Sequence, residues 1–326
     1  MNAPHEKIIL RSPDMALARL FSRELAVPVA IAKILTLRGL RTVDECSKFF
    51  KPEIGHFHDP FLFKDMEKAV VRIMKAIENH ERISVYGDYD VDGITATVIV
   101  LKALRALGAH CDYYLPNRLT EGYGLSAEGV AKLHEAGTRL IITVDCGISA
   151  REEASLAKKL GMDLIITDHH EPGDIPEAWA VLDPKTPGSG YPDDGLAGVG
   201  VALKLCHALA KKTGKPETFW TAYLDLAAVG TAADIVPLTG ENRTIAQLGF
   251  KQLQRTSNSG LKALIAEQGL CGKPLSTGEV GFQIAPCINA VGRLGDPKRG
   301  VELLLTEDPI EAARCARELK EANIER

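Results

Sequence analysis

Short apolar runs alternate with longer amphipathic segments between residues 67 and 167. In the longer segments apolar residues recur every three or four positions, as at Val70, Met74 and Ile77, which is typical of one face of a helix. Most of the short runs are rich in β-branched residues, which predicts strands. The predicted helices cover residues 67–80, 94–107, 126–136 and 149–160, and the predicted strands cover residues 82–86, 111–115, 140–144 and 164–167. This alternation is typical of an α/β fold with a parallel sheet flanked by helices.

The rest of the chain is predicted to be mostly helical. Helical spacing continues over residues 199–212, 217–229, 242–255, 260–268 and 308–326, and two helical fragments at 15–25 and 29–38 precede the sheet. We therefore expect three regions: a lead-in over residues 1–66 that packs on the core, an α/β domain over 67–240, and a helical segment over 241–326.

Composition and charge are those of a globular protein. The chain of 326 residues is 45% hydrophobic and 25% charged, which excludes a disordered or low-complexity protein. Its formal net charge of −4 argues against coating nucleic acid by bulk charge, although a local basic groove is compatible with it. No apolar run is long enough to predict a membrane span. Seven cysteines without a paired C-x-x-C motif favour reduced thiols and a cytoplasmic location.

Metal-type ligands follow several of the predicted strands. Three carboxylates, Asp88, Asp90 and Asp92, stand within five residues after the first strand. Each single aspartate has the alternative interpretation of a helix cap, but three together repel one another unless a cation neutralises them. The other candidates are Asp145 after the third strand, Asp168, His169 and His170 after the fourth, and Asp234 at a helix end. Because ligands of open parallel sheets bind beyond the carboxyl ends of the strands, we expect a two-metal phosphoesterase site there.

These motifs, in their order and spacing, resemble the DHH phosphoesterase superfamily. They are the segments 88–93, 145–147, 168–170 and 233–237. Three further segments, 116–118, 121–125 and 288–294, are similar to its branch of single-strand-specific exonucleases. The resemblance implies a metal-dependent phosphodiesterase that degrades single-stranded DNA from 5′ to 3′ in DNA repair and recombination. It also implies two divalent ions, Mn²⁺ or Mg²⁺, that activate water for attack at phosphorus.

The resemblance also implies a role for each matching residue. The metal ligands are Asp88, Asp90, Asp92, Asp145, His169 and Asp234, with Asp145 bridging the two ions. His170 is expected to face the substrate phosphate, and Asp168 to orient an imidazole, so that His170, Asp145 and Asp168 form the catalytic set. Arg118, Asn289 and Arg293, which we place in turns, are expected to bind the substrate.

Some expectations leave alternatives open. The glycine-rich segment 195–200 is either a phosphate loop or a tight helix start. A small-substrate phosphoesterase and a scaffold protein of the same fold are the competing functions. Single-stranded DNA is the expected partner, with a helicase and a single-strand-binding protein as further partners. Helix 308–326 resembles the connector to a second domain that the family usually carries.

Overall fold

The computed structural model describes residues 11–118, 121–294 and 296–325. The chain divides into two compact units, with the boundary between His56 and Phe57. In the first unit, α1 (Met15–Glu24), α2 (Val29–Leu37), α3 (Val43–Phe50) and the short η1 (Ile54–His56) follow one another. Their core consists of Ala18, Phe21, Ala32, Leu35 and Cys46. The prediction joined residues 1–66 into a lead-in packed on the sheet, whereas the structure gives these helices a core of their own and leaves residues 57–66 with the second unit.

The second unit is built on a sheet of five parallel strands in the order β2-β1-β3-β4-β5. The strands are β1 (Ile83–Gly87), β2 (Cys111–Tyr114), β3 (Leu140–Val144), β4 (Asp163–Thr167) and β5 (Ala180–Leu182). The predicted α/β fold with a parallel sheet is confirmed. The prediction missed β5 because three residues are too few to show a period along the sequence.

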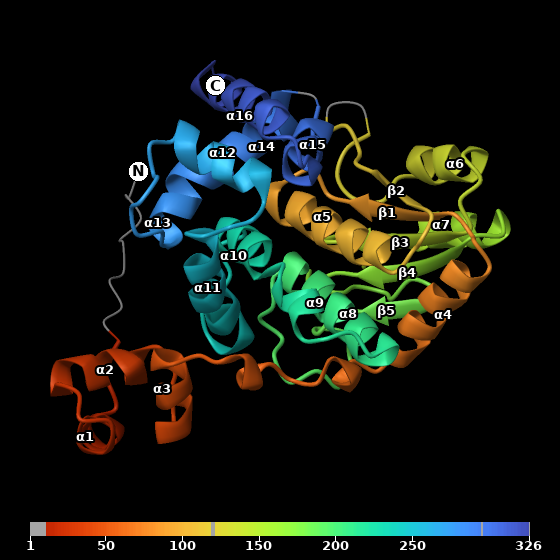
Figure 1. The fold of residues 1–326 in the computed structure, drawn as a ribbon. Coiled ribbons are helices and arrows are strands. Elements are labelled where there is room, and N and C mark those ends of the chain that lie inside the picture. Colours follow the sequence, from red (N-terminus) through yellow and green to blue (C-terminus); the bar gives the residue numbers. More distant parts are fainter. Residues whose placement is uncertain (1–10, 119–120, 295, 326) are drawn as a thin grey trace, which may run out of the picture. The chain divides into compact units, whose positions relative to one another are not determined.

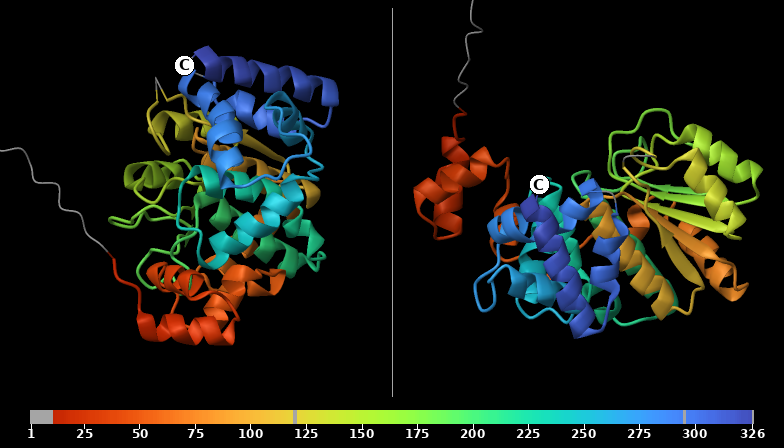
Figure 2. Two further views of the ribbon diagram at one scale, coloured as in Figure 1. Left: turned by 90° about the vertical axis from the view of Figure 1, so that its left-hand side faces the viewer. Right: turned by 90° about the horizontal axis from the view of Figure 1, so that it is seen from above.

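Helices cover both faces of this sheet (Figures 1 and 2). The helices α5 (Val91–Ala106) and α8 (Gly198–Thr213) pack on one face, and α6 (Ala127–Glu135) and α7 (Arg151–Lys159) pack on the other. The path from β1 to β2 runs in the opposite direction to the path from β2 through β3 to β4. Because each crossover is right-handed, the reversal places α5 opposite α6 and α7. The switch in strand order therefore lies between β1 and β3, where ligands of such sheets bind.

The remaining helices surround this core. Preceding the sheet are η2 (Pro60–Leu62) and α4 (Met66–Glu78); following it are α9 (Thr218–Thr221), α10 (Leu224–Ala233), α11 (Gly240–Leu253), α12 (Ser259–Glu267), α13 (Thr277–Glu279), the π-helix η3 (Val280–Ile284), α14 (Ala285–Leu294), α15 (Lys298–Leu305) and α16 (Pro309–Glu325). The helix predicted over 217–229 is thus two helices, and the expected division at residue 240 stays a prediction. None of the described helices combines the length and apolar character needed to cross a membrane.

A buried ion pair ties the start of the second unit to two of its helices. Lys204 on α8 is fully buried, and its Nζ lies 2.9 Å from Oε1 of Glu241 on α11. The same ammonium donates to the backbone carbonyl of His58 at 2.6 Å, and the hydroxyl of Tyr191 donates to the other Glu241 oxygen. Every charge in this group has a partner, as a buried ion pair requires.

We predict that Glu241→Gln lowers the free energy of unfolding by about 3–5 kcal/mol, because Lys204 then carries a buried charge without a counter-charge. Adding Lys204→Met should recover part of this loss, since no unpaired charge remains. Urea unfolding measures both effects. The exposed Glu135→Gln serves as a control, with an expected change within about 0.5 kcal/mol. A cost below about 1 kcal/mol for Glu241→Gln would contradict this account.

Candidate metal centre

The loop between β1 and α5 places three carboxylates at the carboxyl edge of the sheet. Asp90 is the N-cap of α5 and accepts a hydrogen bond from the Gly93 amide at 3.0 Å. Asp88 is buried beneath it. A Cβ at Gly93 would lie 2.6 Å from the backbone oxygen of Asp88, so only glycine allows the loop to fold this tightly. Asp90 is thus a helix cap, as one interpretation of the sequence expected. It nevertheless lies with the other two carboxylates at the same edge of the sheet.

Asp92 links this loop to the beginning of α8. Its two carboxylate oxygens accept hydrogen bonds from the amides of Gly198 at 2.7 Å and Val199 at 3.0 Å. A Cβ at Gly198 would lie 2.4 Å from Oδ1 of Asp145, so this glycine lets α8 approach the carboxylates. The glycine-rich segment is therefore a tight helix start whose first amides bind a carboxylate of the chain itself.

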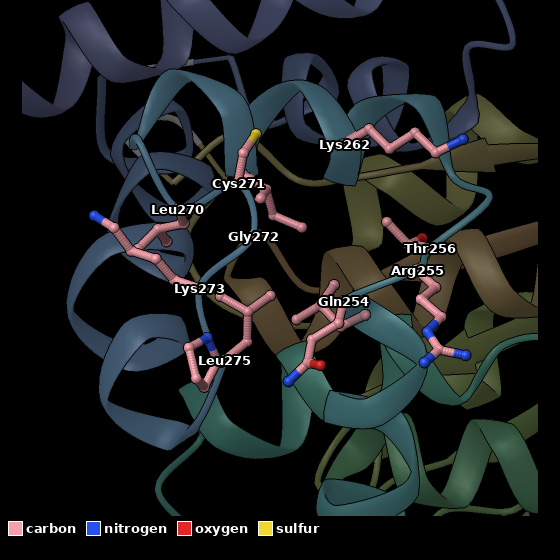
Figure 3. Close-up of a pocket in the computed structure, with 12 residues that line it drawn as sticks. Gln254, Arg255, Thr256, Lys262, Leu270, Cys271, Gly272, Lys273 and Leu275 are labelled. Atoms are coloured by element: carbon pink, nitrogen blue, oxygen red, sulfur yellow. The ribbon is translucent and has the colours of Figure 1, made fainter.

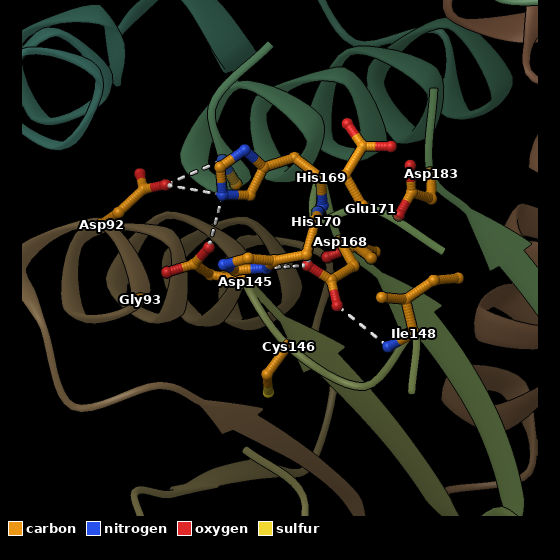
Figure 4. Close-up of polar contacts among 12 residues, drawn as sticks. Asp92, Gly93, Asp145, Cys146, Ile148, Asp168, His169, His170, Glu171 and Asp183 are labelled. Carbon is orange, nitrogen blue, oxygen red and sulfur yellow. Dashed lines mark hydrogen bonds and ion pairs between the residues drawn. The ribbon is translucent and has the colours of Figure 1, made fainter. Parts of the chain in front are cut away.

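Asp145 and His169 lie beside Asp92 (Figure 4). Asp145 follows β3 with a left-handed backbone (φ 60°), which aspartate tolerates better than most residues. The Nε2 atom of His169 lies 3.1 Å from Oδ1 of Asp145, 3.8 Å from Oδ2 of Asp234 and 3.9 Å from Oδ2 of Asp92. Three other segments of the chain thus converge on one imidazole.

Several buried polar atoms of this cluster have no hydrogen-bond partner among the described residues. They are Oδ1 of Asp88, Oδ1 of Asp145, Nε2 of His169 and Oδ2 of Asp234. Buried polar atoms without partners are rare and costly. Carboxylate oxygen and imidazole nitrogen are ligands that suit Mn²⁺ and related divalent ions, so the orphaned atoms fit a metal site.

The ligand atoms fall into three overlapping groups, each with all its atoms within 4.8 Å of one another. The groups are Asp88, Asp90 and Asp145; Asp92, His169 and Asp234; and Asp145, His169 and His170. Asp145 and His169 each belong to two groups. Shared ligands of this kind can hold two cations close together.

Burial and mutual repulsion shift the pKa values of this cluster. Burial, together with the neighbouring Asp90, raises the pKa of Asp88 to about 7 and that of Asp234 to about 6. Burial also raises the pKa of Asp92 and of Asp145 well above the usual value. The strongest repelling charge is Asp234 for Asp92 and Asp92 for Asp145. For His169, burial and the neighbouring His170 lower the pKa to about 4, which keeps the imidazole neutral and able to bind a metal.

His170 has different surroundings from His169. Its Nδ1 lies 2.7 Å from Oδ1 of Asp168, and its Nε2 lies 3.1 Å from the hydroxyl of Tyr123. The hydrogen bond with Asp168 raises the pKa of His170. Burial alone would raise the pKa of Asp168, but His170 and the amides of Ile148 and His169 outweigh it and lower that pKa. The imidazole that Asp168 orients is therefore His170, whose side chain remains 44% exposed.

Sequence reasoning gave Tyr123 no role of its own. It belongs to the segment 121–125 that helped to identify the family, but a lone tyrosine in a loop gives no sign of its partner. In the structure its ring packs edge-on against Tyr89 and lies near His170. Tyr123, Asp168 and His170 also line a pocket of about 250 Å³ beside the metal-type ligands.

Of the three expected substrate-binding residues, Arg118 lies in a turn as predicted, whereas the other two lie on a helix. Asn289 and Arg293 belong to α14 rather than to turns, because Pro286 stands in the first turn of that helix, where proline is tolerated. Asn289 lines a pocket of about 130 Å³ together with Asp90 and Asp234. The side chain of Arg293 lies outside the described part of the structure. The guanidinium of Arg118 stacks over the ring of Tyr89, 5.4 Å from its centroid.

A larger pocket of about 570 Å³ between α11 and the segment after α12 holds none of the metal-type ligands (Figure 3). Arg255, Lys262 and Lys273 line it, but the ammonium groups of the two lysines extend from opposite sides of the pocket. These side chains do not converge on one point, so the pocket lacks the arrangement of cations that would bind an anion.

Comparison with known proteins agrees with this geometry. Residues 82–231 match the DHH family, N-terminal domain. The chain is 45% identical to the single-stranded-DNA-specific exonuclease RecJ of Bacillus subtilis, over 97% of this chain and 40% of that protein. It is 37% identical to the RecJ of Escherichia coli, over 91% of this chain and 53% of that protein. The chain thus spans about half the length of the relatives that it matches.

Solved structures give the same assignment. A crystal structure of exonuclease RecJ bound to manganese matches with a TM-score of 0.74 and 39% identity, over 81% of this chain and 66% of that one. RecJ of Thermus thermophilus in complex with Mn²⁺ matches with a TM-score of 0.82 and 34% identity, over 97% of this chain and 45% of that one. The strand order, the clustered ligands and these likenesses agree. The chain therefore belongs to the DHH family, among the relatives of RecJ.

Proposed function

We propose that this chain is the catalytic core of a RecJ-type exonuclease, a metal-dependent phosphodiesterase that degrades single-stranded DNA from 5′ to 3′ in repair and recombination. The observation that carries the proposal is the sharing of Asp145 and His169 between overlapping groups of buried ligands. The RecJ relatives, described as specific for single-stranded DNA, support the choice of substrate. The complete ligand set argues against the scaffold alternative.

In this proposal two divalent ions, Mn²⁺ or Mg²⁺, are held by Asp88, Asp90, Asp92, Asp145, His169 and Asp234. Asp145 would be shared by the two ions, and its membership of two of the ligand groups supports this role. Ions bound there would supply Lewis acidity at the phosphoryl oxygens and lower the pKa of water. The protein contributes fixed carboxylates that are already desolvated, so that they need not reorganise when substrate enters.

His170 acts on the substrate phosphate in this proposal. Its raised pKa favours the charged imidazolium, and Asp168 fixes the ring through Nδ1. The Nε2 atom is then a donor that can leave the Tyr123 hydroxyl and bind a phosphate oxygen, as a charge-assisted hydrogen bond. In the same proposal, Arg118, Asn289 and Arg293 bind the DNA strand away from the scissile phosphate. A helicase and a single-strand-binding protein deliver the strand. The reaction takes place in the cytoplasm.

Asp145→Asn is expected to lower the rate of mononucleotide release from a 5′-labelled single-stranded oligonucleotide by more than about a hundredfold, ~2.7 kcal/mol. An amide cannot supply the negative charge that two cations share. The melting temperature of the metal-free variant should equal or exceed that of the parent, because one of the repelling carboxylates is gone.

The exposed Asp174→Asn is the matched control and should keep the parent rate. An RNA dinucleotide and pyrophosphate serve as competing substrates. If the Asp145→Asn variant kept a tenth of the parent rate, the proposal that Asp145 binds both ions would be wrong. Faster hydrolysis of either small substrate than of DNA would favour the small-substrate phosphoesterase instead.

His169→Ala and His170→Ala should differ in bound metal. We predict that the first variant loses about one ion per chain, because Nε2 of His169 is one of the buried ligand atoms without a hydrogen-bond partner among the described residues. The second should keep its metal but lose turnover, because its ring is held by Asp168 and Tyr123. Elemental analysis after equilibration with Mn²⁺ measures this, with the exposed His134→Ala as control. Equal metal loss in both variants would show that His170 is a ligand.

Metal binding should release protons at neutral pH. Since the pKa of Asp88 is raised to about 7 and that of Asp234 to about 6, Mn²⁺ affinity should rise as the pH rises from about 5 to about 8. In the metal-free protein, the stability of the folded state should change with pH in the opposite direction to the metal affinity. The folded state holds carboxyl protons that the unfolded state has lost, so the contribution of these carboxyl groups to stability falls as the pH rises from about 4 to about 7.

Calorimetry in two buffers of different ionisation enthalpy counts the released protons, and thermal melts in a chelator follow the metal-free stability. Asp88→Asn should release fewer protons than the parent. A proton count near zero at pH 6 would mean that the carboxylates are already ionised without metal, contrary to this prediction.

A further inference from the structure

Two large apolar side chains beside the metal centre are almost fully exposed. Phe282 on η3 is 85% exposed, and Ile235, directly after Asp234, is 88% exposed. Single exposed apolar residues are common on protein surfaces. These two are separated by 47 positions in sequence, yet their neighbours in the chain, Asp234 and Gly281, line the same pocket.

The helix around Phe282 places it at the rim of the metal pocket. Gly281, Ala285 and Pro286 line the small pocket that also contains Asp90 and Asp234. Phe282 lies four residues before Pro286, so the two side chains stand on nearly the same ridge. Proline cannot donate the backbone hydrogen bond of a regular turn, and the chain forms a π-helix before it. π-Helical turns of this kind occur frequently at functional sites.

Ile235 has a backbone that its side chain disfavours. Its φ is 61°, in the left-handed region where a β-branched residue is a true outlier. Burial does not compensate for this strain, because the side chain is exposed. Strained residues persist where the surrounding structure holds them, and they gather at ligand-binding sites. The strain turns an apolar side chain outward next to a metal-type ligand.

We propose that Phe282, together with Ile235 next to Asp234, forms a stacking platform for one base of the DNA strand whose phosphate lies at the carboxylates. The proposal rests on the proposed function and specifies how the strand is held. Single-stranded nucleic acid is bound largely by stacking of bases on aromatic rings, which works for any base. The chain has a net charge of −4, so stacking supplies affinity that bulk charge does not.

This platform also favours single strands over duplexes. A base inside a duplex is already stacked on both faces and has no free face for Phe282. Only a base released from its partner can reach the ring. The preference then arises at the site where the bond is cut, through a contact that is not specific to sequence.

The test uses oligonucleotides that carry 2-aminopurine at one of the first three positions from the 5′ end, in a buffer with Ca²⁺ but neither Mn²⁺ nor Mg²⁺, so that the carboxylates hold cations without their proposed catalytic metal. The parent chain should quench the fluorescence at one of these positions, because 2-aminopurine loses emission when it stacks on an aromatic ring. Phe282→Ala should abolish this quenching and weaken binding about tenfold, whereas Phe282→Trp should keep both. Ile310→Ala, which removes an equally exposed apolar residue on α16, should change neither.

A second variant separates stacking from folding. Ile235→Asn suits the left-handed backbone better than isoleucine does, so we expect a higher melting temperature together with weaker oligonucleotide binding. Equal quenching by the parent and Phe282→Ala would overturn the proposal. So would unchanged DNA binding accompanied by loss of self-association in Phe282→Ala, which would assign the surface to contacts between copies of the chain. Failure of the proposed function has a different signature, namely normal quenching without hydrolysis when Mn²⁺ is added.

Discussion

The buried carboxylates after β1 and β3 repel one another in a region from which water is excluded, and the rest of the site is arranged around that repulsion. Part of the negative charge is met by the chain itself. The amides of Gly198 and Val199 at the start of α8 bind Asp92, and the positive end of that helix faces the cluster. What remains on Asp88, Asp145 and Asp234 is met by protons when no cation is present, as their raised pKa values show. Ions and protons therefore compete for the same atoms.

Neighbouring residues divide two tasks at the end of β4. Burial lowers the pKa of His169, whose Nε2 lies among the carboxylates, while the hydrogen bond with Asp168 raises the pKa of His170, whose Nε2 lies beside the hydroxyl of Tyr123. Three consecutive residues, 168–170, thus hold two imidazoles with opposite pKa shifts. Such a pair of titratable groups with diverging environments is what metal-assisted hydrolysis at neutral pH requires.

Much of this arrangement follows from sequence alone, and the exceptions have physical reasons. Strand ends carry Asp88, Asp145 and His169, so their meeting at one edge follows from parallel topology. The approach of α8 to Asp145 could not be foreseen, because it depends on the missing Cβ of Gly198 and on packing between distant segments. Asn289 was expected in a turn because proline and glycine near it resemble helix breakers, whereas Pro286 sits where a helix accepts it. The helices of the first unit have their own core because apolar residues from three short helices meet, a non-local event that periodicity does not report.

The different tasks of His169 and His170 depend on the pairing of β4 with β3. Consecutive side chains of a strand point to opposite faces of its sheet, and a slip of one residue exchanges the faces. In the observed register Val144 pairs with Thr167, and the two histidines follow just beyond. An insertion or deletion of one residue within β4 would displace both histidines relative to Asp145 while changing neither residue. The hydrogen-bond ladder between these two strands is therefore part of the metal site, although it contributes no ligand atom.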